Sequence, residues 1–243
     1  MNVNVIDWKK HIFDAVSGTL LGIILTLITY VVGIHFNWIT EDPSQIEFWG
    51  VVFNYACVYL TARQSIVNWP LGIIAVIFLG LLFWDLKLYS SMTLNWVYFF
   101  PIQFYGWYSW LYGGKGKTER DVSFLSIKQW LKIIVLGIVS WIVISEINKY
   151  FGGASPMLDT SILMLSIVAQ FLLTYKKLES WLFWIVVNVL SIYLYYNSGA
   201  QVVAFQYLLF LGNAFYGLGS WLISYWDKIL FGKKKITIWP FYF

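Results

Sequence analysis

Long stretches of apolar residues set the strongest limit on how this chain can fold. Several runs of at least 17 residues carry no charge, and residues 18–34 read GTLLGIILTLITYVVGI. A helix needs roughly 17 to 25 such residues to cross about 30 Å of hydrocarbon. Only 12% of the chain is charged, about half the fraction in soluble domains. A membrane β-barrel would need alternating polar and apolar residues, so we expect an all-α integral membrane protein.

The apolar runs divide into eight expected membrane helices. The breaks are marked by Asn68-Trp69-Pro70, by Gly113-Gly114 and by Gly152-Gly153, which suit helix starts, helix ends and loops. The expected helices lie near residues 18–34, 46–62, 68–84, 92–111, 130–148, 158–174, 181–197 and 202–222. Asp7 and Asp14 precede the first helix and no small-residue cleavage site follows, so we expect a retained helix and no cleaved signal.

Positive charge is distributed unevenly between the loops of this arrangement. Of the 16 Lys and Arg residues, only Lys87 and Lys149 fall on one side of the membrane. Because basic loops stay in the cytoplasm, both termini are expected there. The same loops account for the net charge of +4, so nucleic-acid binding is not expected.

The sequence contains an internal repeat at a spacing of 112 residues. After a one-residue deletion in the second copy the spacing becomes 111. FYGWYSWL at Phe104 and FYGLGSWL at Phe215 agree at six of eight positions. Other matches are Leu60 with Leu172, Trp69 with Trp181, Trp84 with Tyr196 and Asp85 with Asn197. Three helices per copy and one linker helix give the two copies the same orientation, an arrangement found in transporters. The expected organisation is an extra N-terminal helix in 1–45, the first repeat in 46–112, a basic loop and linker helix in 113–156, the second repeat in 157–223 and a basic cytoplasmic tail in 224–243.

One helix of the second repeat carries aromatic and polar residues on one side. Trp181, Trp184 and Asn188 fall within an arc of roughly 60° on an α-helix. At the positions of Trp184 and Asn188 the first repeat has Gly72 and Val76. A stripe kept only for packing should survive in both copies, so the difference favours a ligand site near the middle of the membrane, where the copies face each other.

Amides lie near the middle of other expected helices as well. Hydrogen bonds between helices, worth roughly 0.6 kcal/mol each, explain any single one of them. Taken together, they favour a polar cavity between the repeats. The candidate substrate-binding residues are Trp181, Trp184, Asn188, Gln103, Trp107, Gln206, Asn213 and Asn54. Pro101 lacks a backbone donor and is expected to bend its helix close to Gln103 and to free a carbonyl, as at a local hinge.

The remaining residues exclude several classes of function. No Lys or Arg and no Asp or Glu lies deep in an expected helix, which disfavours anionic substrates and leaves no carrier for a coupling ion. Leu111 replaces the first glycine that a phosphate-binding loop requires. His11 and His35 have no ligand spacing, so no metal, cofactor or enzymatic activity is expected. The other tryptophans assigned to the headgroup level are Trp8, Trp38, Trp49, Trp110, Trp130, Trp221 and Trp226.

Four segments together resemble the PnuC family of bacterial nicotinamide riboside transporters. They are NWPLGII at Asn68, FYGWYSW at Phe104, LLTYKKLESWLFWIVVN at Leu172 and FYGLGSW at Phe215, within residues 46–223. The resemblance implies two parallel three-helix bundles joined by a linker helix, as in SWEET sugar transporters, in the bacterial inner membrane. It also implies a homotrimer that takes up nicotinamide riboside by facilitated diffusion, with trapping by cytoplasmic phosphorylation.

The Trp-x-x-Trp-x-x-x-Asn pattern is the most specific part of this resemblance, which implies that Trp181, Trp184 and Asn188 line the substrate pocket. The helix in residues 1–45 departs from the usual family pattern. Two alternatives stay open from the residues: a uniporter for a sugar or another nucleoside on the same fold, and a membrane receptor that does not transport.

Overall fold

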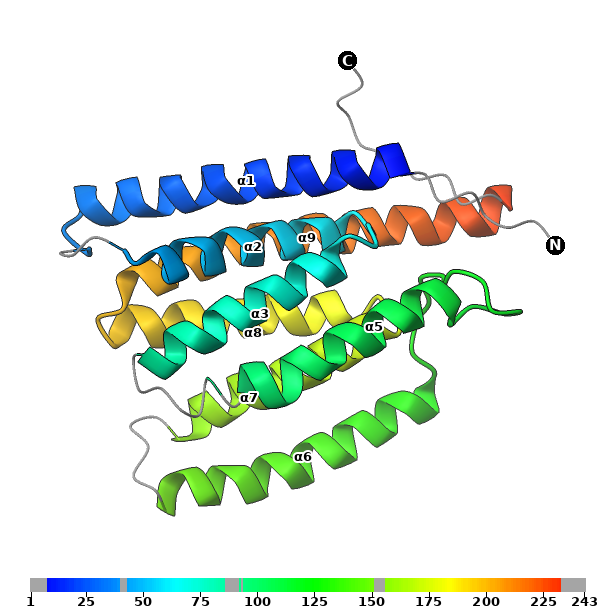
Figure 1. Cartoon of the computed structure of the whole chain (residues 1–243). Coiled ribbons are helices and arrows are strands. Elements are labelled where there is room, and N and C mark those ends of the chain that lie inside the picture. The colour runs from blue at the N-terminus through cyan, green and yellow to red at the C-terminus, as the bar shows by residue number, and fades with distance from the viewer. Residues whose placement is uncertain (1–7, 40–42, 86–91, 93, 151–155, 233–243) are drawn as a thin grey trace. The chain divides into compact units, whose positions relative to one another are not determined.

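The computed structural model describes residues 8–39, 43–85, 92, 94–150 and 156–232, and these are almost entirely helical (Figure 1). No strand forms in these residues, apart from one isolated bridge between Ser123 and Lys177. The helices are α1 (Trp8–His35), α2 (Gln45–Ala62), α3 (Asn68–Asp85), the π-helix η1 (Leu94–Phe99), α5 (Phe100–Tyr112), α6 (Ile127–Tyr150), α7 (Pro156–Thr174), α8 (Ser180–Asn197) and α9 (Gln201–Phe231). The prediction of an all-α fold is therefore confirmed, and each expected helix is present.

Two helices are longer than the apolar runs that predicted them. α1 begins at Trp8, ten residues before the expected start, and α9 continues to Phe231. Charged residues end an apolar run but not a helix, because the backbone hydrogen bonds close within the helix in water as well as in lipid. The longer α1 has one consequence: Asp14, which was expected to precede the first helix, lies inside it and is buried.

Five of the described helices are long and apolar enough to cross a membrane, namely α1, α3, α6, α7 and α9. α2 and α8 have 18 residues each, but their Trp, Tyr and Asn residues lower the mean hydropathy. α5 has 13 residues and continues η1, which has six. For α2, α5 and α8 the crossing of the membrane stays a prediction.

The chain consists of two compact units, residues 1–108 and residues 109–243. The first unit contains α1, α2, α3, η1 and most of α5, and the second contains α6, α7, α8 and α9. In each unit the leading helix packs on the next: α1 lies along α2, and α6 lies along α7 (Figure 1). α1 therefore has the same place in the first unit that α6 has in the second.

The internal repeat recurs as one contact inside each unit. In the first, a Cβ atom on Gly106 would overlap the ring of Trp69; in the second, a Cβ atom on Gly217 would lie 2.5 Å from the ring of Trp181. The two indoles are 112 residues apart and the two glycines 111 apart, which is the spacing of the sequence repeat. Each unit thus buries an indole against a bare stretch of helix backbone.

Two tryptophans assigned to the headgroup level lie in the core instead. Trp110 is 1% exposed and Trp221 is completely buried, and their rings meet edge to face with centroids 5.8 Å apart. The Nε1 of Trp110 donates a hydrogen bond to the carbonyl oxygen of Leu173 at 3.0 Å. A buried indole is stable once its N–H is paired, so the headgroup assignment was wrong for both. Trp8 and Trp226, by contrast, are exposed.

Candidate functional site

The predicted stripe on α8 faces away from open surface. α8 is a continuous α-helix, so Trp181, Trp184 and Asn188 share one side of it. Trp181 is 2% exposed and Asn188 is 3% exposed, while Trp184 is half-buried. On the same helix Leu182 and Val186 are exposed. The polar stripe is therefore the buried side of α8, and the aliphatic residues are its outer side.

Trp181 packs against two residues of α9. Its ring lies against Gly217 and meets Trp221 edge to face at 5.4 Å. The first unit has the equivalent contact between Trp69 and Gly106. Trp181 therefore belongs to the scaffold that the two units share, although its Nε1 is buried with no hydrogen-bond partner among the described residues. Trp184 and Asn188 are the part of the stripe that only the second unit has.

Gln206 and Asn213 lie on α9, the helix packed against α8 in the second unit. Both are half-buried, and their spacing of seven residues puts them on one face of α9. Five of the eight candidate residues therefore lie on two adjacent helices of one unit. That these five residues bind one ligand stays a prediction.

The other three candidates lie in the first unit. Gln103 on α5 is buried, and Asn54 on α2 and Trp107 on α5 are half-buried. The carboxamide of Gln103 lies across Gly72 of α3: a Cβ atom on Gly72 would be 2.7 Å from its Oε1 and 3.0 Å from the Sγ of Cys57. Gln103 can occupy this place because α3 has no side chain there.

The two units fill this position differently. The second unit has Trp184 at the place of Gly72, and Ala214, which is 2% exposed, at the place of Gln103. The bulky group thus comes from α5 in the first unit and from α8 in the second. That the two sets of candidates line one chamber stays a prediction.

The helix type changes just before Pro101, where the sequence predicts a bend. η1 is a π-helix that ends at Phe99, and the α-helical pattern resumes as α5. Proline has no N–H to donate, and its ring would clash with the carbonyl four residues earlier. A wider turn before Pro101 relieves that clash, and such π segments are frequent at functional sites. The segment ends four residues before Gln103.

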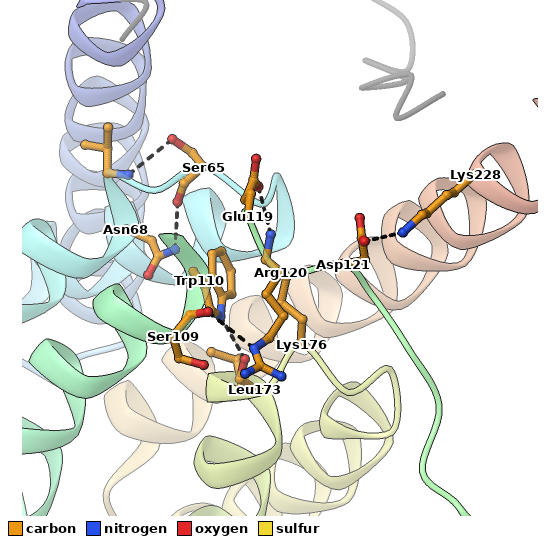
Figure 2. A network of polar contacts seen from close by, with 11 residues as sticks. Ser65, Asn68, Ser109, Trp110, Glu119, Arg120, Asp121, Leu173, Lys176 and Lys228 are labelled. Carbon is orange, nitrogen blue, oxygen red and sulfur yellow. Dashed lines mark hydrogen bonds and ion pairs between the residues drawn. The ribbon is translucent and has the colours of Figure 1, made fainter. Parts of the chain in front are cut away.

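The turn between α7 and α8 is held by a polar network that the sequence did not reveal (Figure 2). Lys176 is completely buried; its Nζ is 3.1 Å from Glu119 Oε1 and 4.4 Å from the centre of the Trp110 ring. From the sequence, Lys176 is expected to be one of the basic loop residues on the cytoplasmic side. Arg120 donates from Nε to the carbonyl oxygen of Ser109, and Lys228 pairs with Asp121 (Figure 2).

Further contacts tie the connection between α5 and α6 to the same turn. The N–H of Leu125 donates to Glu179 Oε1 at 2.8 Å, and Lys177 Nζ donates to the carbonyl oxygen of Phe124. Burial lowers the pKa of Lys177, while the carboxylate of Glu179 opposes that shift. The start of α8, just before Trp181, is therefore held by the connection between α5 and α6, which is not part of the second repeat.

Comparison with protein families gives a match over most of the chain. Residues 44–223 match the family model described as nicotinamide mononucleotide transporter. The nicotinamide riboside transporter PnuC of Neisseria mucosa is 32% identical over 195 residues, which cover 76% of this chain and 74% of that protein. The transporter of the same name from Escherichia coli is 28% identical over 211 residues, covering 75% and 87%. The riboflavin/roseoflavin transporter RibM of Streptomyces davaonensis is 21% identical over 199 residues, covering 76% and 92%.

A solved structure extends the likeness beyond the family model. The crystal structure of the vitamin B3 transporter PnuC matches with a TM-score of 0.67 and 29% identity, covering 89% of this chain and 95% of that chain. Residues 44–243 are 200 of the 243 residues, or 82%. A share of 89% therefore includes residues before 44, where α1 lies.

Proposed function

We propose, since this chain belongs to the nicotinamide mononucleotide transporter family, that it carries nicotinamide riboside across the membrane by facilitated diffusion. The observation that supports this most directly is the pair Trp184 and Asn188. Both lie on the inward side of α8, and the equivalent positions of the first unit hold Gly72 and Val76. A ligand without two-fold symmetry needs such a difference between otherwise similar halves.

The chemistry of these residues fits a flat cation. The pyridinium ring of nicotinamide riboside can stack on the indole of Trp184, an attraction worth about 2 kcal/mol when desolvated. Its carboxamide can pair with Asn188 or Gln103, and the ribose hydroxyls can pair with Gln206 and Asn213. A membrane potential of about 100 mV, negative inside, favours entry of one positive charge by about 2.3 kcal/mol. No coupling ion is needed for uptake under these conditions.

The same residues favour the riboside over its mononucleotide. A buried phosphate requires Arg, Lys or a helix N-terminus. In the two repeats the only basic residues are Arg63, Lys87, Lys176 and Lys177. None lies within a described helix, and Lys176 already pairs with Glu119. The proposed pocket therefore offers no charge to a phosphate.

Further parts of the proposal concern the arrangement in the membrane. The two three-helix repeats enclose the pocket, with Trp107 and Asn54 contributing from the first unit. Both termini lie in the cytoplasm of a bacterial cell, in agreement with the distribution of Lys and Arg. The protein works as a homo-oligomer, and cytoplasmic phosphorylation of the riboside retains it in the cell.

Uptake by proteoliposomes tests the proposal. We expect Trp184→Ala and Asn188→Ala each to lower nicotinamide riboside uptake at least tenfold. A factor of ten corresponds to about 1.4 kcal/mol of lost binding free energy. Trp184→Phe, which keeps a weaker aromatic face, should retain part of the activity. Trp226→Ala is the matched control, because Trp226 is an exposed indole of α9 in the same unit. Wild-type uptake by both alanine variants contradicts the assignment of the site.

A potassium diffusion potential separates the proposed substrate from neutral ones. Uptake of a cation should rise when the interior is made negative, whereas uptake of a pentose or of riboflavin should not change. Displacement of bound nicotinamide riboside by a pentose would favour a sugar uniporter. Saturable binding without any flux would favour a receptor. The panel also includes nicotinamide and the mononucleotide, which we expect to bind more weakly.

A further inference from the structure

Asp14 is an acid buried near the N-terminal end of α1. Its side chain is 3% exposed. Oδ2 accepts a hydrogen bond of 2.6 Å from the Oγ of Ser65, and Oδ1 is 3.8 Å from Nη2 of Arg63. Both partners belong to the turn that joins α2 to α3. A buried carboxylate is stable only with such partners, so this contact fixes α1 to the turn.

The same turn forms the start of α3. The Oγ of Ser65 accepts the N–H of Val67 at 3.4 Å, and the carbonyl oxygen of Ser65 accepts Nδ2 of Asn68 at 2.7 Å (Figure 2). The negative charge of Asp14 also lies near the N-terminus of α3, where the helix dipole favours an anion. Asp14 therefore stabilises the first turn of α3 from a different helix.

Two residues in the first two turns of α3 contact α5. Trp69 packs against Gly106, and Gly72 lies against the carboxamide of Gln103. Gln103 is thus connected to Asp14 through a continuous series of contacts within the first unit. A shift in the start of α3 moves Gly72, and Gln103 must follow or lose its place.

α1 is held firmly enough to act as the fixed end of this series. A Cβ atom on Gly22 would overlap the carbonyl oxygen of Val52, so the backbones of α1 and α2 touch. Further along, the Oγ1 of Thr29 and the hydroxyl of Tyr55 are 3.0 Å apart. Small residues at four-residue spacing permit this close approach. α1 cannot slide along α2 without breaking these contacts.

The second unit has a comparable arrangement built from different residues. Gln64 and Lys176 hold the same place in their turns and both have positive φ, 55° and 47°. In the second unit a carboxylate from outside the three-helix repeat, Glu119, pairs with Lys176. In each unit, then, an acid from a preceding segment fixes the turn from which the central helix starts.

We propose that Asp14 is a positioning residue for substrate binding, acting through Ser65 and the start of α3 on Gln103. This inference rests on the proposed function, because it requires Gln103 to contact the substrate. It makes α1 a working part of the transporter, although the family model begins at residue 44.

A double-mutant cycle on the Kd for nicotinamide riboside tests the inference. We expect Asp14→Ala to weaken binding about threefold to tenfold, the loss of roughly one hydrogen bond, and Gln103→Ala to weaken it by a similar factor. The double variant should bind no more weakly than Gln103→Ala alone, because Asp14 acts through Gln103. Asp14→Asn keeps an acceptor for Ser65 and should recover part of the affinity. Asp85→Asn, an exposed charge at the other end of α3, is the matched control.

The outcomes separate this inference from the proposed function. An unchanged Kd in folded Asp14→Ala, with only the melting temperature lowered, shows a purely structural role and overturns the inference. Effects of Asp14→Ala and Gln103→Ala that multiply in the double variant also overturn it. If Gln103→Ala binds like the wild type while Trp184→Ala does not, the inference fails and the proposed function stands. If the wild type does not bind nicotinamide riboside, the proposed function itself fails. Should Asp14→Ala not fold, Ser65→Ala breaks the same series and gives the same readout.

Discussion

Replacement of Gly217 by alanine tests the packing on which the second unit depends. A Cβ atom at this position would lie 2.5 Å from the ring of Trp181, whereas ordinary van der Waals contact begins near 3.4 Å. The ring, the helix or both must therefore move by the difference of 0.9 Å. Trp181 is 2% exposed and Trp221 lies against it, so little free space is left for that movement.

The expected cost follows from these distances. Overpacking of a filled core costs about 1–3 kcal/mol, while Gly→Ala in a helix gains up to about 1 kcal/mol. Gly219, two residues further along α9, has no atom within 4 Å of a built Cβ, so Gly219→Ala shows the gain alone. We expect the two variants to differ by about 1–3 kcal/mol. A shift of about 2–4 °C per kcal/mol then separates their melting temperatures by several degrees.

Thermal unfolding in detergent, followed by tryptophan fluorescence, provides the measurement. The Kd for nicotinamide riboside adds a second readout, because Trp181 lies one turn from Trp184 and a displaced ring should weaken binding. If Gly217→Ala melts at or above the temperature of Gly219→Ala, the contact between Trp181 and Gly217 does not carry the stability assigned to it. The same test applies in the first unit, where Gly106→Ala should disturb Trp69.

Three further predictions concern other contacts. Gly22→Val should lower the melting temperature, because its side chain meets a backbone carbonyl of α2, whereas Gly137→Val on α6 should be tolerated, since nothing lies within 4 Å of a built Cβ there. Glu119→Gln should destabilise the protein, and its effect should largely vanish in a Lys176→Met background, because the first variant takes the counter-charge from the completely buried Lys176 and the second removes the buried charge itself; additive shifts in melting temperature would contradict the pairing. Trp110→Phe should cost about 0.5–1.5 kcal/mol by chemical denaturation, since it removes one of the two hydrogen bonds that the carbonyl oxygen of Leu173 accepts, the other coming from the N–H of Lys176; an unchanged midpoint would show that the hydrogen bond contributes nothing.

The helices were predictable because their signals are local. Uncharged runs, Asn68-Trp69-Pro70 and the paired glycines mark the helices and their ends in the sequence itself. The repeat was also visible, because glycine and tryptophan are retained at positions where an indole packs on backbone. The bend expected at Pro101 stays a prediction, and the π-helix η1 directly precedes this proline.

The misplaced residues were those whose environment depends on tertiary contacts. Trp110 and Trp221 lie near the ends of apolar runs, which is typical of headgroup tryptophans, and only their contact with each other shows otherwise. Asp14 sits among charged residues before an apolar run, and its burial depends on Ser65, 51 positions away. Periodicity carries no information about such partners. The inward side of α8 was predictable because it needed only the helical period.

The position of α1 has a practical consequence for anyone who shortens this protein. Trimming to residues 44–223, the part that the family model matches, deletes α1 entirely. The face of α2 that α1 covers would then be uncovered, and the hydroxyl of Tyr55 would lose the hydrogen bond with Thr29. Arg63 would lose its buried counter-charge at the same time. The first and last residues of the family match are therefore unsuitable as cloning limits here. A tag or fusion partner is better placed before Trp8 than in place of α1.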